Sequence, residues 1–355
     1  MRSEALRIPD ANGAERGAAL DLPLGAPLGW CLFAHAGLSD GSTERLLSGA
    51  LVGKGIAVLR LALRPESPLP EAIEEVLAAA DFLRQSRGVP RLLAGHGLGG
   101  AAVLGAGPGI PDEAAVAVLA CPAGEIQEAA LASLDRPLLF LHSPVDEKVP
   151  IEAASRLFAA ARHPKSFLSL GKADHLLSAP EAARAAGEML AAWAVPQLAP
   201  TAPEAIGVPP GEVLLGGDGH HLVQEIVAGH HWLAADEPLS VAGGTDQGPN
   251  PYELLLAALG ACTSMTLQLY AARKKLPLEG VRVRLRHSRI HAADCAACQT
   301  QEGLLTRLER EIELDGPLSP EERDLLLGIA DRCPVHRTLA SEIDVVTRLV
   351  QARTV

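Results

Sequence analysis

The sequence has little that would suit a membrane or a nucleic acid as a partner. It contains no uninterrupted run of about 18 apolar residues, the length that a membrane-spanning helix needs, so we expect no such helix. Basic residues are outnumbered, with 31 Lys and Arg against 43 Asp and Glu, and the net charge of -12 argues against a polyanionic partner. Residues 1–17 include no apolar segment typical of an export signal. We therefore expect a cytoplasmic protein.

Cysteines number only six, which argues against a disulfide framework in a chain of 355 residues without an export signal. We expect each cysteine to be reactive, metal-binding or simply buried. The six are Cys31, Cys121, Cys262, Cys295, Cys298 and Cys333. Hydrophobic residues make up 48% of the chain, enough for two globular cores.

The first half of the sequence alternates short apolar runs with helical patterns. This alternation predicts a mostly parallel sheet flanked by helices. The strand candidates are residues 30–34, 56–61, 91–95, 115–120, 137–142 and 166–170. The helix candidates are residues 70–85, 99–106, 151–161 and 180–194.

The pattern changes after residue 195. A stretch rich in Pro and Ala, residues 196–211, reads as a linker. Short strands, a Gly/Pro loop at 243–251, one long apolar helix at 252–274, two strands and two helices follow. Segregated strands and helices predict an α+β domain. We therefore expect domains at 1–195 and 212–355.

A sharp strand-to-helix turn, Gly-His-Gly-Leu-Gly-Gly, occupies residues 95–100. It is similar to the G-x-S-x-G nucleophile elbow of the α/β-hydrolase family. Asp146 and His175 follow later strands, in the family's order of nucleophile, acid and histidine. The turn at residues 35–37 matches the place where that fold forms part of its oxyanion hole. The resemblance covers about residues 20–195, and the short segment after residue 120 implies a reduced or absent lid.

The departure from this family is at the nucleophile itself, because Gly97 has no hydroxyl group to attack a carbonyl carbon. The residues of the triad positions are thus Gly97, Asp146 and His175, a degenerate triad. The domain is then a hydrolase-like domain that has lost its catalytic activity and serves folding, dimerisation or ligand binding, or it is a small-molecule binding site without chemistry. Alternatively, Cys121 or Ser143 has replaced the serine.

Two cysteines of the second half stand in different settings. Cys262 lies in the apolar helix after Gly260 and Ala261, where burial alone would make it inert. Cys333 precedes Pro334, which suits the first position of a helix, so Cys333 is predicted to be the N-cap. The helix dipole and the neighbouring Arg and His residues favour its thiolate.

Residues 243–263 (GGTDQGPNPYELLLAALGACT) resemble the first cysteine helix of the OsmC/Ohr family, and residues 331–339 (DRCPVHRTL) its second cysteine motif. The resemblance covers about residues 212–350 and identifies an OsmC-like domain. It implies an intertwined homodimer without a cofactor. It also implies a peroxidase in which Cys262 attacks an organic hydroperoxide, Cys333 forms a disulfide with it, and an external dithiol reduces that disulfide.

The sequence departs from this family at the groups that would activate the thiolate. Tyr252 stands where the best-known members have a glutamate, and Glu253 follows one position later. The family's activating arginine has no clear match, although His230 and His231 lie in that region. Activation then falls to Arg337, a histidine or Glu253, and we predict Arg337.

A last cluster is His287, His291, Cys295 and Cys298. The CxxC spacing suits zinc, with His291 within reach, but two histidines four residues apart on a strand are about 13 Å apart. The cluster is therefore a zinc site, a second redox pair or a loop with incidental cysteines, and we predict no metal. For the whole chain the alternatives to a peroxidase are an ester or thioester hydrolase and a non-catalytic ligand-binding scaffold.

Overall fold

The computed structural model describes residues 2–9, 13, 15–36, 42–110, 114–124, 126, 128–198, 207–217, 221–291 and 303–350. The chain forms two compact units, Met1–Gly248 and Pro249–Val355. The linker predicted at residues 196–211 falls inside the first unit, and its first residues belong to a helix that continues to Leu198.

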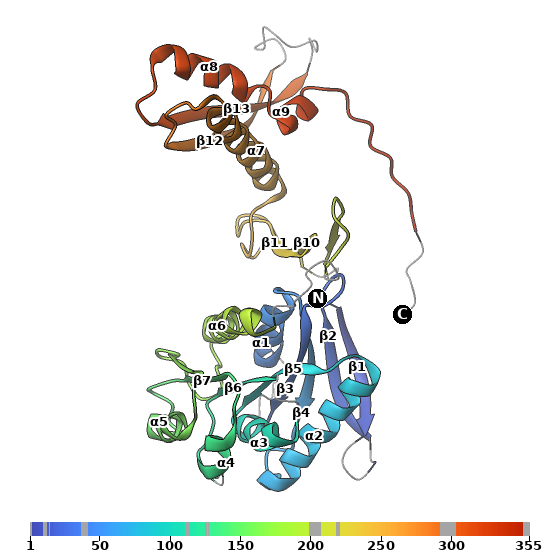
Figure 1. The fold of residues 1–355 in the computed structure, drawn as a ribbon. Helices are drawn as coiled ribbons and strands as arrows, with labels where there is room; N and C mark the ends of the chain where they lie inside the picture. The colour runs from blue at the N-terminus through green and yellow to red at the C-terminus, as the bar shows by residue number, and fades with distance from the viewer. Residues whose placement is uncertain are drawn as a thin grey trace. The chain divides into compact units, whose positions relative to one another are not determined.

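The first unit is built on an eight-stranded sheet with the order β1-β2-β4-β3-β5-β6-β7-β8 (Figure 1). The last six strands in this order run parallel, whereas β1 and β2 are antiparallel at one edge. The strands are β1 (Arg2–Pro9), β2 (Glu15–Leu22), β3 (Gly29–His35), β4 (Ile56–Ala62), β5 (Pro90–His96), β6 (Ala115–Leu119), β7 (Leu138–His142) and β8 (Lys165–Ser169).

Helices cover both faces of this sheet, which confirms the predicted fold class. Leu47 and Leu190 bring α1 and α6 into the hydrophobic layer on one face. Val76, Val103 and Leu157 bring α2, α3 and α5 into the layer on the other. The helices are α1 (Thr43–Val52), α2 (Leu69–Ser86), α3 (Leu98–Ala106), the 3-10 helix η1 (Gly107–Gly109), α4 (Glu128–Ser133), α5 (Ile151–Ala160) and α6 (Pro180–Leu198).

A small antiparallel sheet with the order β11-β10-β9 also belongs to the first unit. Its strands are β9 (Val213–Gly216), β10 (Gln224–Ala228) and β11 (His231–Ala235). The Trp232 ring packs so closely on Gly55 that an ideal Cβ there would lie 2.6 Å from it. Gly55 also has a φ of +82°, so both its conformation and this contact require glycine.

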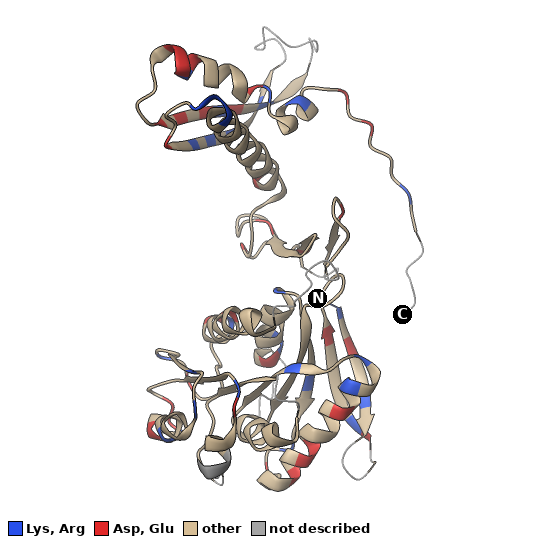
Figure 2. Cartoon of the chain, in the orientation of Figure 1, with Lys and Arg blue, Asp and Glu red and all other residues tan. Residues whose placement is uncertain are grey.

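The second unit is α+β, as predicted. The long strands β12 (Gly280–His291) and β13 (Leu304–Asp315) form an antiparallel hairpin. Their outer faces carry cross-strand ion pairs such as Arg282–Glu313, so the alternating charges of this region form a solvated face (Figure 2). The helices are α7 (Pro251–Lys274), α8 (Pro320–Ala330) and α9 (Pro334–Leu339). Leu267 of α7 and Leu326 of α8 form the core with the hairpin.

Helix α7 begins with a capping box in which Asn250 and Glu253 satisfy each other's backbone amides. Among the described residues it is the helix long and apolar enough to cross a membrane, by length and composition alone, with a mean hydropathy of 1.5. Polar residues such as Thr263, Ser264 and Gln268 still interrupt its apolar stretches, and the expectation that no helix spans a membrane stays a prediction. Only 28% of the 18 residues over which this hydropathy is averaged are buried, so the unit leaves much of α7 uncovered.

Candidate functional site

The turn between β5 and α3 has the backbone of a nucleophile elbow. Gly97 stands at its tip with φ +57° and ψ -123°. The flanking glycines are required by packing, because an ideal Cβ on Gly95 would overlap the Gly99 backbone and one on Gly99 would overlap the Ala34 carbonyl group. Gly97 differs: the described atom nearest to an ideal Cβ there is His175 Nε2, at 3.9 Å. The geometry therefore has room for a side chain where the sequence has none.

His175 and Asp146 meet as the order of the triad predicts. His175 Nδ1 donates to Asp146 Oδ2 at 2.8 Å, and the carboxylate also accepts the backbone amides of Lys148 and Val149. Burial by itself would raise the pKa of Asp146, but the amide of Val149, His175 and Lys148 together hold it below its usual value. The ionised Asp146 keeps the proton of His175 on Nδ1 and leaves Nε2 free to accept a proton beside Gly97.

Two more histidines lie at the carboxyl ends of neighbouring strands, His35 on β3 and His96 on β5. His96 Nε2 lies 2.7 Å from the His175 carbonyl oxygen and therefore carries the hydrogen. Among the described residues the Nδ1 atoms of both histidines have no hydrogen-bond partner. Burial lowers the pKa of each to about 4, so both are neutral at pH 7. The surroundings of Gly97 thus contain neutral imidazoles. Gly37, the last residue of the predicted oxyanion turn, lies outside the described residues.

The two proposed replacements for the serine have other roles in this geometry. Cys121 is buried and its thiol points to the Pro122 carbonyl oxygen at 3.6 Å. Burial raises the pKa of that thiol, which keeps it protonated and unreactive. The Ser143 hydroxyl group is also buried, bonded to the Gly171 carbonyl oxygen and to the Val145 amide. Among the described residues, neither group forms a hydrogen bond with His175.

In the second unit, Cys333 is the N-cap of α9, as predicted. It is fully buried, and its Sγ accepts the His336 backbone amide at 3.3 Å. Sγ also lies 3.7 Å from the Thr263 hydroxyl group on α7. Thr263 is the residue after Cys262, so the fold brings the two cysteine segments together. Both cysteines are free thiols.

Arg310 on β13 is a residue of this site that the sequence analysis missed. Its guanidinium group donates to Thr263 Oγ1 at 2.9 Å, to the Ala330 carbonyl oxygen at 3.2 Å and to Asp331 at 2.6 Å. Its side chain is only 12% exposed. A charged group held in this way beside Cys333 fixes the position of Thr263 and α8. A basic residue on an inward-facing position of an otherwise alternating strand was the only signal in the sequence.

The other residues predicted for the peroxidase site are Cys262, Glu253 and Arg337. Cys262 is half-buried on α7, whereas Glu253 is exposed and bound in the capping box. Nine residues along a helix separate these two by roughly 13 Å, so one copy of the chain does not bring them together. The Arg337 side chain on α9 is exposed. Its role as the activating cation stays a prediction, while Arg310 is the cation that reaches Cys333 through Thr263.

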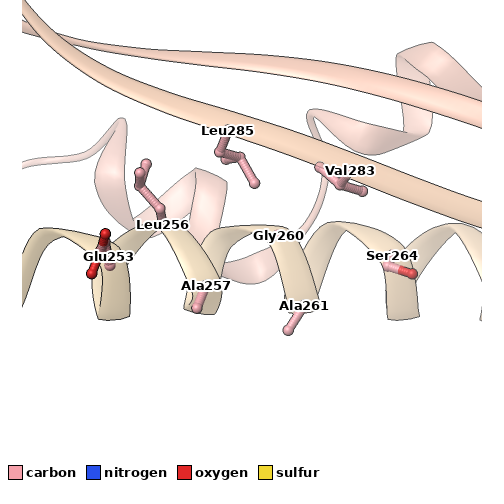
Figure 3. A pocket seen from close by; sticks show the side chains of 8 residues that line it. All are labelled: Glu253, Leu256, Ala257, Gly260, Ala261, Ser264, Val283 and Leu285. Atoms are coloured by element: carbon pink, nitrogen blue, oxygen red, sulfur yellow. The ribbon is translucent and has the colours of Figure 1, made fainter. Parts of the chain in front are cut away.

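An open groove of about 460 Å³ runs between α7 and β12. In Figure 3, Leu256 and Leu285 approach each other from the helix and the strand, with Val283 further along the strand. Gly260 allows this approach, since an ideal Cβ there would lie 2.8 Å from Leu285 Cδ1. The groove is thus largely apolar, with Glu253 at one end and Ser264 at the other.

The predicted metal alternative falls largely outside the described residues, because they include neither Cys295 nor Cys298. His287 and His291 both lie on β12. The His287 ring stacks on Tyr252, with ring centroids 4.0 Å apart, which joins the start of α7 to the hairpin. Within the described ranges, no three His, Cys, Asp or Glu residues are placed to hold a metal ion.

Comparisons with known proteins found matches to the N-terminal and to the C-terminal part of the chain. The family model "OsmC-like protein" matches residues 244–348. The esterase domain of a Rhodothermus marinus protein is 34% identical with a TM-score of 0.51, over 55% of this chain and 99% of that one. Est1E from Butyrivibrio proteoclasticus is 20% identical with a TM-score of 0.48, over 55% and 99%. A lidless α/β serine hydrolase from Xanthomonas campestris is 20% identical with a TM-score of 0.46, over 54% and 95%. No curated protein matches the chain.

The parallel sheet, the elbow and the His175–Asp146 pair define the N-terminal part as a domain of the α/β-hydrolase fold. The match at residues 244–348 adds an OsmC-like domain. The chain therefore contains an α/β-hydrolase-like domain followed by an OsmC-like domain, as the two sequence resemblances predicted.

Proposed function

We propose that the OsmC-like domain is a thiol peroxidase that reduces organic hydroperoxides with Cys262 and Cys333 as its redox pair. The observation that carries this proposal is the contact of Cys333 with Thr263, next to Cys262 on α7. Two cysteines far apart in the sequence thereby lie on adjoining segments, which a reversible disulfide requires. The hydrolase-like domain lacks a serine nucleophile and takes no part in this reaction.

The reaction begins with the Cys262 thiolate, whose sulfur attacks the terminal oxygen of the hydroperoxide. The O–O bond breaks, and the alkoxide takes a proton and leaves as an alcohol, so Cys262 becomes a sulfenic acid. The Cys333 sulfur then attacks the Cys262 sulfur, and hydroxide leaves with a proton as water. An external dithiol returns both thiols by exchange and is itself oxidised to a disulfide.

We assign Arg310 a positioning role in the second step. Thr263 can turn its hydroxyl hydrogen from the Leu259 carbonyl oxygen towards sulfur when Cys333 loses its proton. Arg310 holds the Thr263 oxygen in place for this. Arg337 is the second candidate cation, four residues after Cys333 and so on the same side of α9.

The groove between α7 and β12 supports an organic rather than an inorganic peroxide. Leucine and valine side chains form its walls, and Ala261, the residue before Cys262, lies on its border. An apolar substituent bound there would leave water for an apolar surface, which stabilises the complex by about 25 cal/mol for each Å² buried. Hydrogen peroxide has no such substituent.

The test uses one equivalent of cumene hydroperoxide on the reduced full chain. We expect the mass to fall by the two hydrogens of a disulfide, and peptide mapping to join the peptides of Cys262 and Cys333. The matched control is Cys333→Ser, which should stop at the sulfenic acid on Cys262 and react with dimedone there. Turnover of peroxide with both thiols still free would overturn the proposal.

We also propose that a second copy of this chain covers the exposed apolar side of α7. Met265 and Leu269 are 61% and 70% exposed, although the helix is otherwise apolar. The net charge of -12 supports neither nucleic acid nor an anionic membrane as the partner of this surface. A cytoplasmic location, where thiol pools keep cysteines reduced, suits the proposed dithiol.

Sedimentation equilibrium checks the dimer. We expect twice the chain mass at micromolar concentration, and the monomer mass for Leu269→Glu, because a carboxylate at this position is costly only when a partner buries it. A matched substitution at another exposed leucine, Leu239→Glu, should leave the dimer intact. A monomeric wild-type protein at these concentrations contradicts the proposal.

A further inference from the structure

The hydrolase-like domain keeps the nucleophile elbow and the His175–Asp146 pair of a carbonyl-attacking site but lacks the serine side chain. The backbone at Gly97 keeps the conformation of a nucleophile elbow, with φ +57° and ψ -123°, although there is no serine side chain for it to present. Asp146 is almost fully buried and holds the tautomer of His175 with a 2.8 Å hydrogen bond. His175 Nε2 faces the space over the Gly97 Cα atom, and its side chain is 15% exposed, so solvent reaches it.

The size of that space decides what can act as the nucleophile. An ideal Cβ at Gly97 would be 3.9 Å from Nε2, and no other described atom outside residues 96–98 lies within 4 Å of it. A water molecule about one bond length closer to Nε2 than this Cβ, where the oxygen of a serine would stand, would be within hydrogen-bond distance of Nε2. Cys121 and Ser143 are both turned away into hydrogen bonds of their own.

We propose that this domain hydrolyses neutral, activated carboxylic esters by direct attack of water, with His175 as the general base and no acyl-enzyme intermediate. This activity is independent of the peroxidase. His175 Nε2 takes a proton from water while the water oxygen bonds to the carbonyl carbon, and the π electrons move to the carbonyl oxygen. The C–O bond to the leaving group then breaks, and the leaving alkoxide receives that proton from His175. Ester and water thus give acid and alcohol.

The start of α3 supplies the stabilisation that the tetrahedral oxyanion needs. The first amides of a helix have no acceptor within it, and α3 begins at Leu98, directly after Gly97. In the elbow the amide after the nucleophile position points at the developing oxyanion. Burial keeps His35 and His96 neutral, so neither imidazole supplies a positive charge for an anionic acyl group. A neutral ester with a good leaving group therefore fits best.

The test is hydrolysis of p-nitrophenyl acetate by the full chain. Wild type should turn over, and His175→Ala should lower kcat/KM by about 100-fold or more, as general bases do. Gly97→Ala puts a methyl group next to the place of the water and should cost about 10-fold, since a small displacement of the nucleophile is enough. His230→Ala, the same change at an exposed histidine of this unit, should have no effect. Melting temperatures and a His175→Gln variant separate loss of the base from loss of the fold.

Intact-mass spectra during turnover decide the nucleophile. An unmodified wild-type protein agrees with attack by water. An acetyl group on Cys121, Ser143 or any other residue of this unit overturns it and assigns that residue instead. Wild-type hydrolysis no faster than buffer, or equal rates for folded His175→Ala and wild type, would overturn it too. None of these outcomes affects the disulfide experiment on Cys262 and Cys333, so the two proposals fail separately.

Discussion

Gly97→Ser is expected to raise the hydrolysis of p-nitrophenyl acetate by about 1000-fold over the wild-type protein. The reason is geometric: the backbone already has the elbow conformation, and the new Cβ would stand 3.9 Å from His175 Nε2 with no other described atom outside residues 96–98 within 4 Å. A serine oxygen one bond further on can reach hydrogen-bond distance of that nitrogen. The enzyme would then react through an acyl-serine and show a burst of p-nitrophenol.

Labelling with a fluorophosphonate provides the second measurement. Gly97→Ser should be labelled on residue 97, whereas the wild-type protein has no hydroxyl group there. The double variant Gly97→Ser/His175→Ala should keep its fold and lose both the burst and the label, because the serine then lacks its base. A folded Gly97→Ser protein that neither bursts nor reacts with the probe shows that His175 and the elbow are not aligned for attack.

Acid should destabilise the hydrolase-like domain between pH 6.5 and pH 4. The pKa of His35 and of His96 is about 4 in the folded chain because burial opposes their charged forms, and the nearby Arg60 adds to this for His35. The unfolded chain titrates near 6.5, so in this interval it binds more protons than the folded chain. Stability is therefore full above pH 6.5 and falls as the pH drops towards 4. We expect a loss on the order of 5 kcal/mol for both histidines together, since one pKa unit is about 1.4 kcal/mol.

Urea unfolding of the full chain at several pH values measures this slope. His96→Gln is the matched variant, because its amide can still donate to the His175 carbonyl oxygen but takes up no proton near neutral pH. It should reduce the dependence on pH by roughly half. Asp146 contributes only at lower pH, since its folded pKa is depressed below that of an ordinary carboxyl group. A slope that stays the same in His96→Gln means that other groups cause the loss.

The two domains use histidine and cysteine in opposite electrostatic settings. Around Gly97, burial keeps His35 and His96 neutral, which leaves His175 with Asp146 as the pair able to move a proton. Around Cys333, the His336 backbone amide donates to the sulfur, and the largely buried Arg310 donates to the Thr263 hydroxyl group beside it. The first arrangement suits proton transfer, and the second places hydrogen-bond donors around a sulfur atom and its neighbour.

Structural features that depend on residues close together in the chain could be predicted from the sequence. The elbow follows from the glycines at positions 95, 97 and 99, which are spaced two residues apart. At Gly95 and Gly99 packing leaves no room for a Cβ. The N-cap position of Cys333 follows from Pro334. The helix predicted at residues 180–194 ends too early, because the Pro- and Ala-rich stretch after it predicts a linker from residue 196 although Pro196 is part of the helix. The helix continues to the buried Leu198.

Arg310 shows what such reasoning misses. Its importance comes from contacts with Thr263, Ala330 and Asp331, which lie on α7, at the end of α8 and just beyond it. No spacing in the sequence links these residues to a strand position. Arg337, the activating cation that the sequence predicts, lies within the second cysteine motif at residues 331–339. Its side chain is exposed in the structure.

The sequence by itself determined both folds, the absent serine at position 97 and the two cysteine segments, because each is encoded by residues a few positions apart. Only the tertiary structure decided that His175 faces Gly97 with room between them, that Cys333 meets Thr263, and that Arg310 is the cation at this contact. These facts depend on side chains from distant elements meeting in space, and their distances are set by packing rather than by order along the chain.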